Sequence, residues 1–529
     1  MDLLSNKRIN TFQMLLKQIG GLQILLGFML WVPLIVSLLY REFYSALGFS
    51  ISSLIILGTG YYLHKNIQSV VEPLNRHALA IAALGWLSIA LMGAIPFVII
   101  AYITPADVAQ QFVPAGADYP SSLMYFKNPL HACFESMSAY TTTGLTMSVH
   151  EPSIGKGLLF YRSLAQLFGG AGFIVLSLAF LTQSSSKAAA LLYGSESSGE
   201  RLQPTIKETA RSIWKIYLGL TLFSTIYLIV GTSVILPDYP LVDTIFDSIN
   251  HAMTAQSTGG FSTLDDSIAG YHSRQMEILY LLPMILGALS IPFYFRVIYE
   301  KQWSQFWKNT QTRGVILACI FGSFILTLLL WESGIVSDPI REGVFQYVSA
   351  LTTTGWQTSN IGSWDSSSIV FIVMGAMIIG GAAGATVGGI KIIRIQLILK
   401  GLFWHVNSYF LSPNSIQVTN FNQKRLLPEQ INKELASAAT FTFVYLLMVF
   451  ISALITAQFM GEGYTMADAL FESASAQGTV GLSSGITDPG MSPVLEITYI
   501  IQMWAGRLEI IPLLVLFRTI LKGSKPVIN

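Results

Sequence analysis

Four short segments of the chain repeat one pattern, a helical run that leads into a turn containing a glycine. Long apolar segments flank each copy. The copies read FESMSAYTTTGLT at Phe134–Thr146, HAMTAQSTGGFS at His251–Ser262, FQYVSALTTTGWQ at Phe345–Gln357 and FESASAQGTVGLS at Phe471–Ser483. Their alignment brings four glycines into register: Gly144, Gly260, Gly355 and Gly481. We call the bends at these glycines the first to fourth turns. One chain with four such turns can place them around a single axis.

The composition indicates a membrane protein. Of the 529 residues, 52% are hydrophobic and only 11% are charged, and the mean hydropathy is +0.56. Soluble proteins carry about 25% charged residues. A stretch of about 20 apolar residues crosses a bilayer. We expect about ten such spans, at 21–40, 46–63, 79–101, 157–182, 214–236, 276–297, 314–331, 367–390, 435–458 and 494–520.

The charges in the connecting loops predict the orientation. With both termini in the cytoplasm, the cytoplasmic stretches hold 22 Lys and Arg against 8 Asp and Glu, and the outward stretches hold 4 against 17. This distribution satisfies the positive-inside rule. The outward acidic excess can also concentrate cations at a pore mouth, although it is equally compatible with ordinary solvated loops. Anion transport is disfavoured in both cases.

The order of spans and turns predicts the domain organisation. An N-terminal helix pair at 1–77 precedes four units, each composed of a span, a pore loop and a second span. The units are 78–204, 205–311, 312–432 and 433–529. The predicted fold is an all-α polytopic membrane protein with four pseudo-symmetric repeats around one central pore. The short pore helices are expected near 130–140, 241–253, 340–350 and 465–475, with their partially negative C-terminal ends toward the axis, where they favour a cation.

The turns have the composition of a cation filter. Irregular backbone at membrane depth is tolerated where it lines a cavity or is buried in protein, and carbonyl oxygens that face an axis can replace the water shell of an ion. Glycine permits the backbone angles that such a turn needs. A scaffold whose re-entrant loops serve another purpose is the alternative. The predicted filter residues are Thr142, Thr143, Gly144, Thr258, Gly259, Gly260, Thr353, Thr354, Gly355, Thr479, Val480 and Gly481.

With these turns in view, the chain resembles the Trk/Ktr/HKT superfamily of potassium transporters, and most closely its TrkH-type branch. The resemblance covers nearly the whole length and includes GGAAGATVGGIKIIR at Gly380–Arg394 and AGRLEIIPLLVLF at Ala505–Phe517. It implies uptake of K⁺, with K⁺ as the filter-bound ion and no organic cofactor. Serine at the first filter glycine accompanies Na⁺ preference in plant relatives, so Gly144 points to K⁺. The second and fourth turns depart slightly from the first, with Gln256-Ser257 and Gln477-Gly478 where the first has Tyr140-Thr141. All four turns carry one filter glycine and are shorter than the TVGYG filter of tetrameric channels, which favours fewer well-formed ion sites and looser K⁺/Na⁺ discrimination.

The resemblance also implies partners and a location. It implies a homodimer in the bacterial cytoplasmic (inner) membrane. It further implies a separate cytoplasmic ring of nucleotide-binding, RCK-type regulatory subunits resembling TrkA. The stretch 401–433 is partly amphipathic and is a plausible docking surface on the cytoplasmic side.

A glycine cluster interrupts the span that follows the third turn. Glycine in a helix interior costs roughly 1 kcal/mol relative to alanine, so we expect the helix to break there. The resemblance implies an intramembrane loop below the filter, which could act as a movable plug. Close helix packing through small residues is the alternative. The cluster comprises Gly375, Gly380, Gly381, Gly384, Gly388 and Gly389, and the last five are the predicted gate residues.

Arg507 is a further predicted gate residue. A charge in the middle of a span costs about 2.5–3.5 kcal/mol, so we expect this side chain to face a wet interior and to repel K⁺ below the filter. The alternative is an ion pair with Glu496 or with a carboxylate on another span, because Glu509 lies on a different helix face. Lys391 is predicted to be an anchor that extends toward the cytoplasmic interface.

No enzyme chemistry follows from the sequence. Gly481–Gly485 matches the G-x-S-x-G pattern of serine hydrolases but lacks the strand-to-helix context of that motif. The histidines show no metal-ligand spacing, and His251 is interpreted as structural. The rival hypotheses are a Na⁺- or NH₄⁺-translocating relative and a non-conducting receptor or assembly subunit. Passive flow and coupled symport with H⁺ or Na⁺ both stay open.

Overall fold

The protein is helical and has several helices of membrane-spanning length. The computed structural model describes residues 2–67, 75–172, 175, 202–364, 366–411, 419–421 and 424–522. Within them, six helical segments are long and apolar enough to cross a membrane. They are formed by α1 with α2 (Asp2–Met29, Trp31–Leu39), α3 (Phe43–Asn66), α4 with α5 (Asn75–Gly93, Ile95–Ile103), α11 (Ile206–Ile235), α16 (Thr310–Ser333) and α20 (Pro428–Phe459). The prediction of a helical membrane protein is confirmed.

Two further apolar segments qualify as spans only if a sharp bend is allowed. The helices α13 and α14 (Arg274–Ala288, Ile291–Ile298) meet at 94°, and α22 and α23 (Pro493–Arg507, Ile511–Lys522) meet at 111°. At the second bend, Glu509 and Ile510 adopt positive φ values of 56° and 66°. Arg507 is the last residue of α22 and lies at the bend, between the two helices of this segment.

The remaining two predicted spans are incomplete in the described residues. The segment 157–182 begins as α8 (Lys156–Ala171) and then runs largely outside the described residues. The segment 367–390 begins as α18 (Ser367–Ile378), which has 12 residues. The structure thus has six clear spans and up to eight with the bent pairs. The ten-span, four-repeat arrangement stays a prediction.

Four short helices lie between pairs of longer ones, near the predicted pore-helix positions. They are α7 (Pro129–Tyr140), α12 (Leu241–Gln256), α17 (Pro339–Leu351) and α21 (Met466–Gly478). Local sequence sets where three of them begin. Asn128 and Asp338 each cap a helix that starts with proline, and Thr465 forms a capping box with Asp468, as expected for such residues at these positions.

The glycine cluster ends a helix, as the sequence indicates. After α18, the strand β1 (Ile379–Gly380) pairs in parallel with β2 (Ile390–Lys391), so residues 381–389 form a closed loop. We call residues 379–391 the glycine-rich loop. Gly375 lies inside α18 and does not interrupt it, so its inclusion among the helix-breaking residues is wrong.

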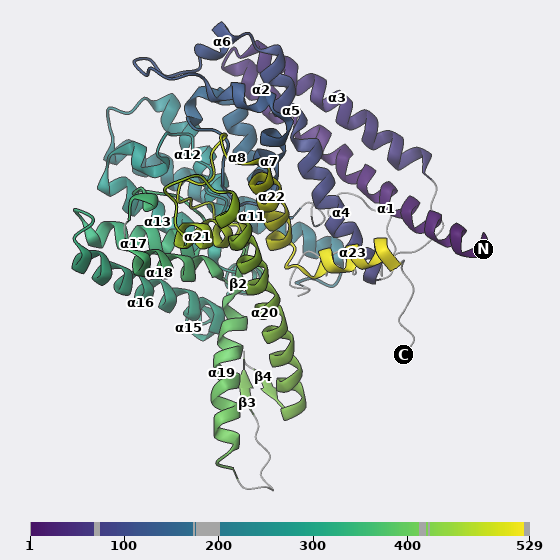
Figure 1. The fold of residues 1–529 in the computed structure, drawn as a ribbon, viewed down its shortest axis with the longest axis vertical. Coiled ribbons are helices and arrows are strands. Elements are labelled where there is room, and N and C mark those ends of the chain that lie inside the picture. The colour runs from purple at the N-terminus through teal and green to yellow at the C-terminus, as the bar shows by residue number, and fades with distance from the viewer. Residues whose placement is uncertain are drawn as a thin grey trace.

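A helical hairpin extends from the rest of the molecule. It consists of α19 (Ile392–Ser408), the antiparallel strands β3 (Thr419–Phe421) and β4 (Lys424–Leu426), and the first turns of α20 (Figure 1). The small connecting elements are α6 (Ala106–Gln110), η1 (Ser122–Lys127), η2 (Glu151–Ile154), η3 (Ser267–Tyr271), α15 (Gln305–Lys308) and η4 (Ile361–Ser363).

The N-terminal helices attach to the first repeat through Glu42. Its carboxylate accepts hydrogen bonds from the N–H groups of Lys156 (2.6 Å) and Gly157 (2.9 Å) at the start of α8. A carboxylate at a helix N-terminus satisfies otherwise unpaired donors. This contact ties the loop between α2 and α3 to the helix that follows the first turn.

Candidate functional site

The four turns share one backbone conformation. Two residues before each glycine is a threonine in the left-handed region, with φ between 50° and 57°, and the glycine itself has φ between 73° and 96°. A β-branched residue with positive φ is uncommon and costs about 1–3 kcal/mol, so the surroundings must hold it in place. The four threonines are Thr142, Thr258, Thr353 and Thr479.

The hydrogen bonds that end each short helix are also repeated. The residue before each turn glycine donates its N–H to the carbonyl group five residues earlier. These bonds join Thr143 to Ser138 (2.8 Å), Gly259 to Thr254 (2.8 Å), Thr354 to Ser349 (3.0 Å) and Val480 to Ser475 (3.0 Å). The sequence also indicates this repeated hydrogen bond, because a serine or threonine followed by alanine occurs at the same position in all four copies. The alignment of the glycines alone does not reveal it.

The turns meet one another in a closed ring. A Cβ atom added to Gly144 would overlap the carbonyl oxygen of Gly259, and one added to Gly260 would overlap that of Thr354. Similarly, a Cβ on Gly355 would overlap the Val480 carbonyl oxygen, and one on Gly481 the Thr143 carbonyl oxygen. The first turn thus contacts the second, the second the third, the third the fourth and the fourth the first. The structure brings all four predicted turns together around one centre.

A cavity of about 320 Å³ lies on one side of this ring, and all four turn glycines line it. We call it the vestibule. Three carboxylate residues also line it: Glu151, Asp266 and Asp488. Burial raises the pKa of Glu151 to about 8, although the positive charge of Arg162 acts in the opposite direction. The carboxyl groups of Asp266 and Asp488 can attract cations to the vestibule, and Glu151 adds to this effect only when it ionises.

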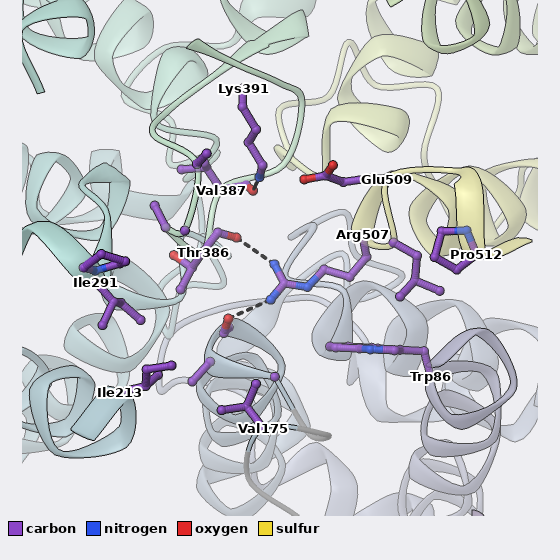
Figure 2. Close-up of a pocket in the computed structure, with 18 of the residues that line it drawn as sticks. Trp86, Val175, Ile213, Ile291, Thr386, Val387, Lys391, Arg507, Glu509 and Pro512 are labelled. Carbon is purple, nitrogen blue, oxygen red and sulfur yellow. Dashed lines mark hydrogen bonds between the residues drawn. The ribbon is translucent and has the colours of Figure 1, made fainter. Parts of the chain in front are cut away.

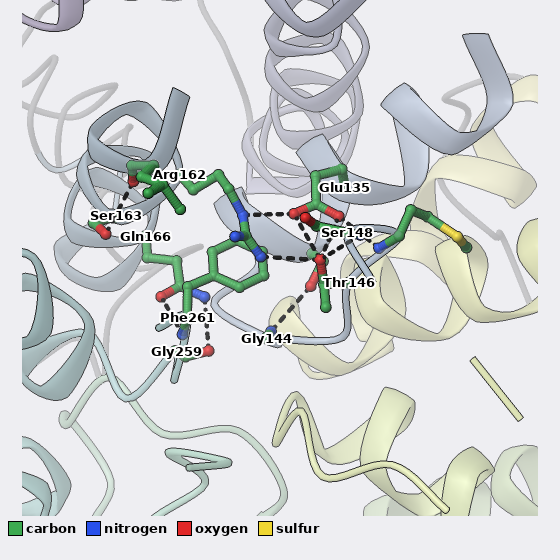
Figure 3. A network of polar contacts seen from close by, with 12 residues as sticks. Glu135, Gly144, Thr146, Ser148, Arg162, Ser163, Gln166, Gly259 and Phe261 are labelled. Atoms are coloured by element: carbon green, nitrogen blue, oxygen red, sulfur yellow. Dashed lines mark hydrogen bonds and ion pairs between the residues drawn. The ribbon is translucent and has the colours of Figure 1, made fainter. Parts of the chain in front are cut away.

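The first turn is supported by a buried ion pair that the sequence interpretation missed. Arg162 on α8 and Glu135 on α7 lie 2.7 Å apart (Arg162 Nε to Glu135 Oε1), and both side chains are buried. Arg162 also donates to the Thr146 hydroxyl and stacks on the ring of Phe261 after the second turn. The pair therefore connects the first and second turns (Figure 3).

Gln166 also supports the second turn. Its amide nitrogen donates to the carbonyl oxygen of Gly259 at 2.6 Å, and its amide oxygen accepts from the N–H of Phe261 at 3.2 Å (Figure 3). Only the structure identifies this residue, because a lone glutamine in an apolar span has no characteristic sequence pattern.

The glycine-rich loop lies against the threonine side of the ring, opposite the vestibule. The Thr386 hydroxyl is 3.2 Å from the Thr258 hydroxyl, and the Gly388 N–H donates to the Thr353 hydroxyl at 3.2 Å. A Cβ on Gly388 would overlap the Gly478 carbonyl oxygen and the Thr479 hydroxyl. The loop therefore contacts the second, third and fourth turns.

The other predicted gate glycines lie in the same loop. Gly380 packs against Gly388, and Gly381 approaches the end of α13 at Ala288. Gly384 and Gly389 have positive φ values of 82° and 65°, a conformation that glycine adopts without strain.

Arg507 completes the contacts below the ring. Its guanidinium donates to the carbonyl oxygens of Thr386 (2.7 Å), Gly169 (2.6 Å) and Gly170 (2.7 Å). Figure 2 shows Arg507 extending toward Thr386, with the hydrogen bond that joins them. One of its nitrogens is 3.4 Å from the Thr142 hydroxyl of the first turn. Arg507 thus joins the glycine-rich loop to the end of α8 and contacts the first turn, whereas the loop contacts the other three.

A second cavity, of about 470 Å³, opens beside Arg507 and the glycine-rich loop. Lys391, Arg394, Arg507 and Glu509 line it. Lys391 is buried, with 8% of its surface exposed, and donates to the Val387 carbonyl oxygen. The prediction that Lys391 extends to the interface is wrong, because the pairing of β1 with β2 holds it inside the protein.

The carboxylates considered as partners of Arg507 have other partners. Glu496 lies 2.9 Å from His131, and Glu509 pairs with Arg394 at 2.5 Å. The proposed pairing of Arg507 with Glu496 is therefore wrong. The bend after Arg507 turns Glu509 toward α19 and away from the face of α22.

The hydrolase-like motif at Gly481–Gly485 belongs to the fourth turn. It follows the helix α21, and the Ser483 hydroxyl donates to Glu472 at 2.8 Å. Within the described residues, no group of three or more His, Cys, Asp or Glu side chains is placed to hold a metal ion.

Comparisons with known proteins agree with this architecture. A family model described as TrkH, cation transport protein, matches residues 107–526. An uncharacterized cation transporter of Methanocaldococcus jannaschii is 32% identical over 95% of this chain and 94% of its own length. The Trk system potassium uptake protein TrkH of Escherichia coli is 29% identical over 96% of this chain and 98% of its own length.

A solved structure shows the same fold. The crystal structure of the potassium transporter TrkH from Vibrio parahaemolyticus superimposes with a TM-score of 0.76 at 25% sequence identity, covering 96% of this chain and 98% of that one. The resemblance inferred from the turns is thereby confirmed. The chain belongs to the TrkH family of cation transport proteins, within the Trk/Ktr/HKT superfamily.

Proposed function

We propose that the protein moves K⁺ across the cytoplasmic membrane through a filter made by the four turns. The observation that carries this proposal is the closed ring in which each turn glycine packs on the backbone of the next turn. Carbonyl oxygens gathered around one centre can replace the water of a monovalent cation. The filter residues are those of 142–144, 258–260, 353–355 and 479–481.

The choice of K⁺ is supported by relatives and by one residue. Relatives that match nearly the whole chain are named potassium uptake proteins. Gly144, where Na⁺-preferring plant relatives carry serine, favours K⁺. A relative that carries Na⁺ or NH₄⁺ is the alternative substrate class.

The proposed gate consists of Arg507 and the glycine-rich loop, including Gly380, Gly381, Gly384, Gly388 and Gly389. The contacts of Arg507, Thr386 and Gly388 with the threonines of the four turns support it. A fixed guanidinium below the filter opposes entry of a cation. If the loop moved away from these contacts, a route would open from the ring to the second cavity, which lies beside Arg507.

We extend the proposal to topology and assembly. The ten spans, the four repeats and cytoplasmic termini follow from hydropathy and loop charge. Relatives are named as parts of a Trk system, which supports partnership with further subunits. We propose a homodimer in the inner membrane that rests on a separate nucleotide-binding, RCK-type ring.

Flux measurements in proteoliposomes test the substrate. Vesicles loaded with K⁺ are expected to accumulate radioactive Rb⁺, and external K⁺ should compete more strongly than Na⁺ or NH₄⁺. Stronger competition by Na⁺ or NH₄⁺ would favour the alternative substrates. Vesicles that pass no monovalent cation would point to a receptor or assembly subunit.

The gate is tested by Arg507→Ala in the same vesicles. The variant removes a positive charge that repels Rb⁺ from the proposed path, so we expect basal Rb⁺ flux to rise by about tenfold. Arg518→Ala, which changes an exposed arginine on α23, is the control and should leave flux unchanged. Equal flux in both variants would remove Arg507 from the gate.

A further inference from the structure

One register position differs in charge among the four repeats. Nine residues before each turn glycine, a buried side chain accepts a hydrogen bond from the N–H group three residues after that glycine. Each of the four side chains has 0% of its surface exposed. They are Glu135, His251, Gln346 and Glu472.

In the first repeat the charge at this position is neutralised. Glu135 forms the buried ion pair with Arg162 at 2.7 Å. The guanidinium cancels the carboxylate at short range, so a cation in the ring experiences little net field from the pair.

In the second and third repeats the position is neutral. His251 Nε2 accepts from the Thr263 N–H (3.3 Å), and its Nδ1 lies 2.7 Å from the Tyr280 hydroxyl. A doubly protonated imidazole has no acceptor nitrogen, so this ring is neutral. Gln346, with its amide oriented to suit its neighbours, accepts from the N–H groups of Thr358 (2.8 Å) and Ser359 (3.1 Å).

In the fourth repeat, hydrogen-bond donors surround the carboxylate of Glu472. Glu472 accepts from the Ser483 hydroxyl (2.8 Å), the Ser484 N–H (2.8 Å) and the Thr487 N–H (3.1 Å). The hydroxyls of Ser484 and Thr487 donate as well. In the described part of the chain, no basic side chain lies within ion-pair distance of Glu472. Burial raises the pKa of Glu472, and the hydrogen bonds from Thr487, Ser484 and Ser483 act in the opposite direction. Five donors on one carboxyl group fit its ionised, acceptor-only form.

The position of Glu472 lets its charge act on the ring. Its partners Ser483 and Thr487 line the vestibule together with Gly481. The carboxylate thus lies directly behind the vestibule wall and is shielded from water. Buried charges are screened far less than exposed ones, whereas Asp266 and Asp488 in the same vestibule are exposed.

We propose that Glu472 supplies the unbalanced negative charge that sets the affinity of the protein for the transported cation. This inference rests on the proposed transport function and adds a residue that determines affinity. Gln346 provides an internal comparison, because it accepts the equivalent N–H group without bringing a charge.

The first test is Glu472→Gln, assayed as the concentration dependence of Rb⁺ uptake. Loss of one buried charge near the ring should raise the KM for Rb⁺ by about tenfold while the maximal rate changes less. Glu462→Gln removes an exposed carboxylate from the outward loop before α21 and is the matched control. Its KM should stay unchanged because solvent screens that charge.

Moving the charge separates an electrostatic role from a structural one. The double variant Glu472→Gln with Gln346→Glu places the carboxylate at the equivalent position of the third repeat. We expect it to recover most of the affinity lost in the single variant. If Glu472 only shaped the fourth turn, a carboxylate in another repeat would restore nothing.

Gln346→Glu alone keeps the proposal testable if Glu472→Gln does not fold. It adds a second buried charge to an intact fourth turn and should lower the KM for Rb⁺ several-fold. An unchanged KM in Glu472→Gln, a double variant no better than the single one, or an unchanged KM in Gln346→Glu would each overturn the proposal. Failure of the transport function itself is distinct, because then the unaltered protein would pass no Rb⁺.

Discussion

One threonine in each turn is held in a left-handed backbone conformation that is unfavourable for this residue type. The left-handed threonines are anchored on one side by the helix-ending hydrogen bonds and on the other by the glycine-rich loop or Arg507. The glycines have no room for a side chain, since the neighbouring turn occupies the space. Small changes at these residues should therefore alter the ring itself.

Gly144→Ser tests the first turn. Gly144 has φ 93°, and a Cβ there would overlap the Gly259 carbonyl oxygen, so the substitution should displace both turns. We expect the preference for K⁺ over Na⁺, measured as a permeability ratio in proteoliposomes, to fall by about tenfold.

Gly116→Ser is the matched control for that variant. Gly116 has nearly the same φ, 91°, but no atom lies within 4 Å of the position that an added Cβ would take. Its permeability ratio should match that of the unaltered protein. An unaltered ratio in Gly144→Ser would count against the filter assignment.

External pH should act through Glu151 in the vestibule. With a pKa of about 8, this carboxyl is mostly neutral below that pH and becomes negative above it. As external pH rises from about 7 to about 9, the added charge should lower the KM for Rb⁺ about two- to fivefold. Glu151→Gln should abolish this dependence. A dependence that persists in the variant would exclude Glu151 as its source.

The sequence predicted the turns better than their supports. The four turns could be aligned because each has glycine at the same place. The position nine residues before each glycine, by contrast, holds four residues that differ in type: Glu135, His251, Gln346 and Glu472. These residues share the capacity to accept an N–H group, but they do not share a chemical type. Only the structure reveals that they perform the same task.

At the scale of elements, the glycine-rich loop lies directly against the ring. Gly388→Ala would drive a methyl group into the Gly478 carbonyl and the Thr479 hydroxyl. The loop should retreat from the ring, and basal Rb⁺ flux should rise several-fold.

Gly375→Ala is the control for the loop. Gly375 lies in α18, and an added Cβ would contact nothing within 4 Å. Alanine is about 1 kcal/mol more favourable than glycine in a helix, so this variant should be slightly more stable with unaltered flux. Equal flux in the two variants would argue that the loop does not obstruct the path.

Hydropathy alone does not locate short breaks within a span. A window of apolar residues predicts a span but averages over a break of two or three residues. The bend between α13 and α14 occurs at Leu289 and Ser290, where the Ser290 hydroxyl caps the second helix. The end of α18 was predictable because several glycines follow it. The bend after Arg507 was not, because it forms at Glu509 and Ile510, two residue types that do not usually mark a turn.

At the scale of the whole molecule, the hairpin of α19 and α20 extends away from the other helices (Figure 1). Its end carries two strongly exposed aromatic residues, Tyr409 (77%) and Phe410 (85%). Replacement of both by serine should leave basal Rb⁺ flux unchanged and weaken co-purification with an RCK-type subunit about tenfold. Tyr102→Ser, at an exposed residue at the end of α5 (63%), is the control. Undiminished co-purification would exclude the hairpin as the docking surface.

The closed ring has a genetic consequence. Because its quarters come from one polypeptide, each is encoded separately, and a single codon change acts on one quarter and its immediate neighbour instead of on all four at once. In an assembly of four identical subunits every mutation is imposed fourfold. If the ring is the filter proposed above, selection can adjust its ion preference one quarter at a time.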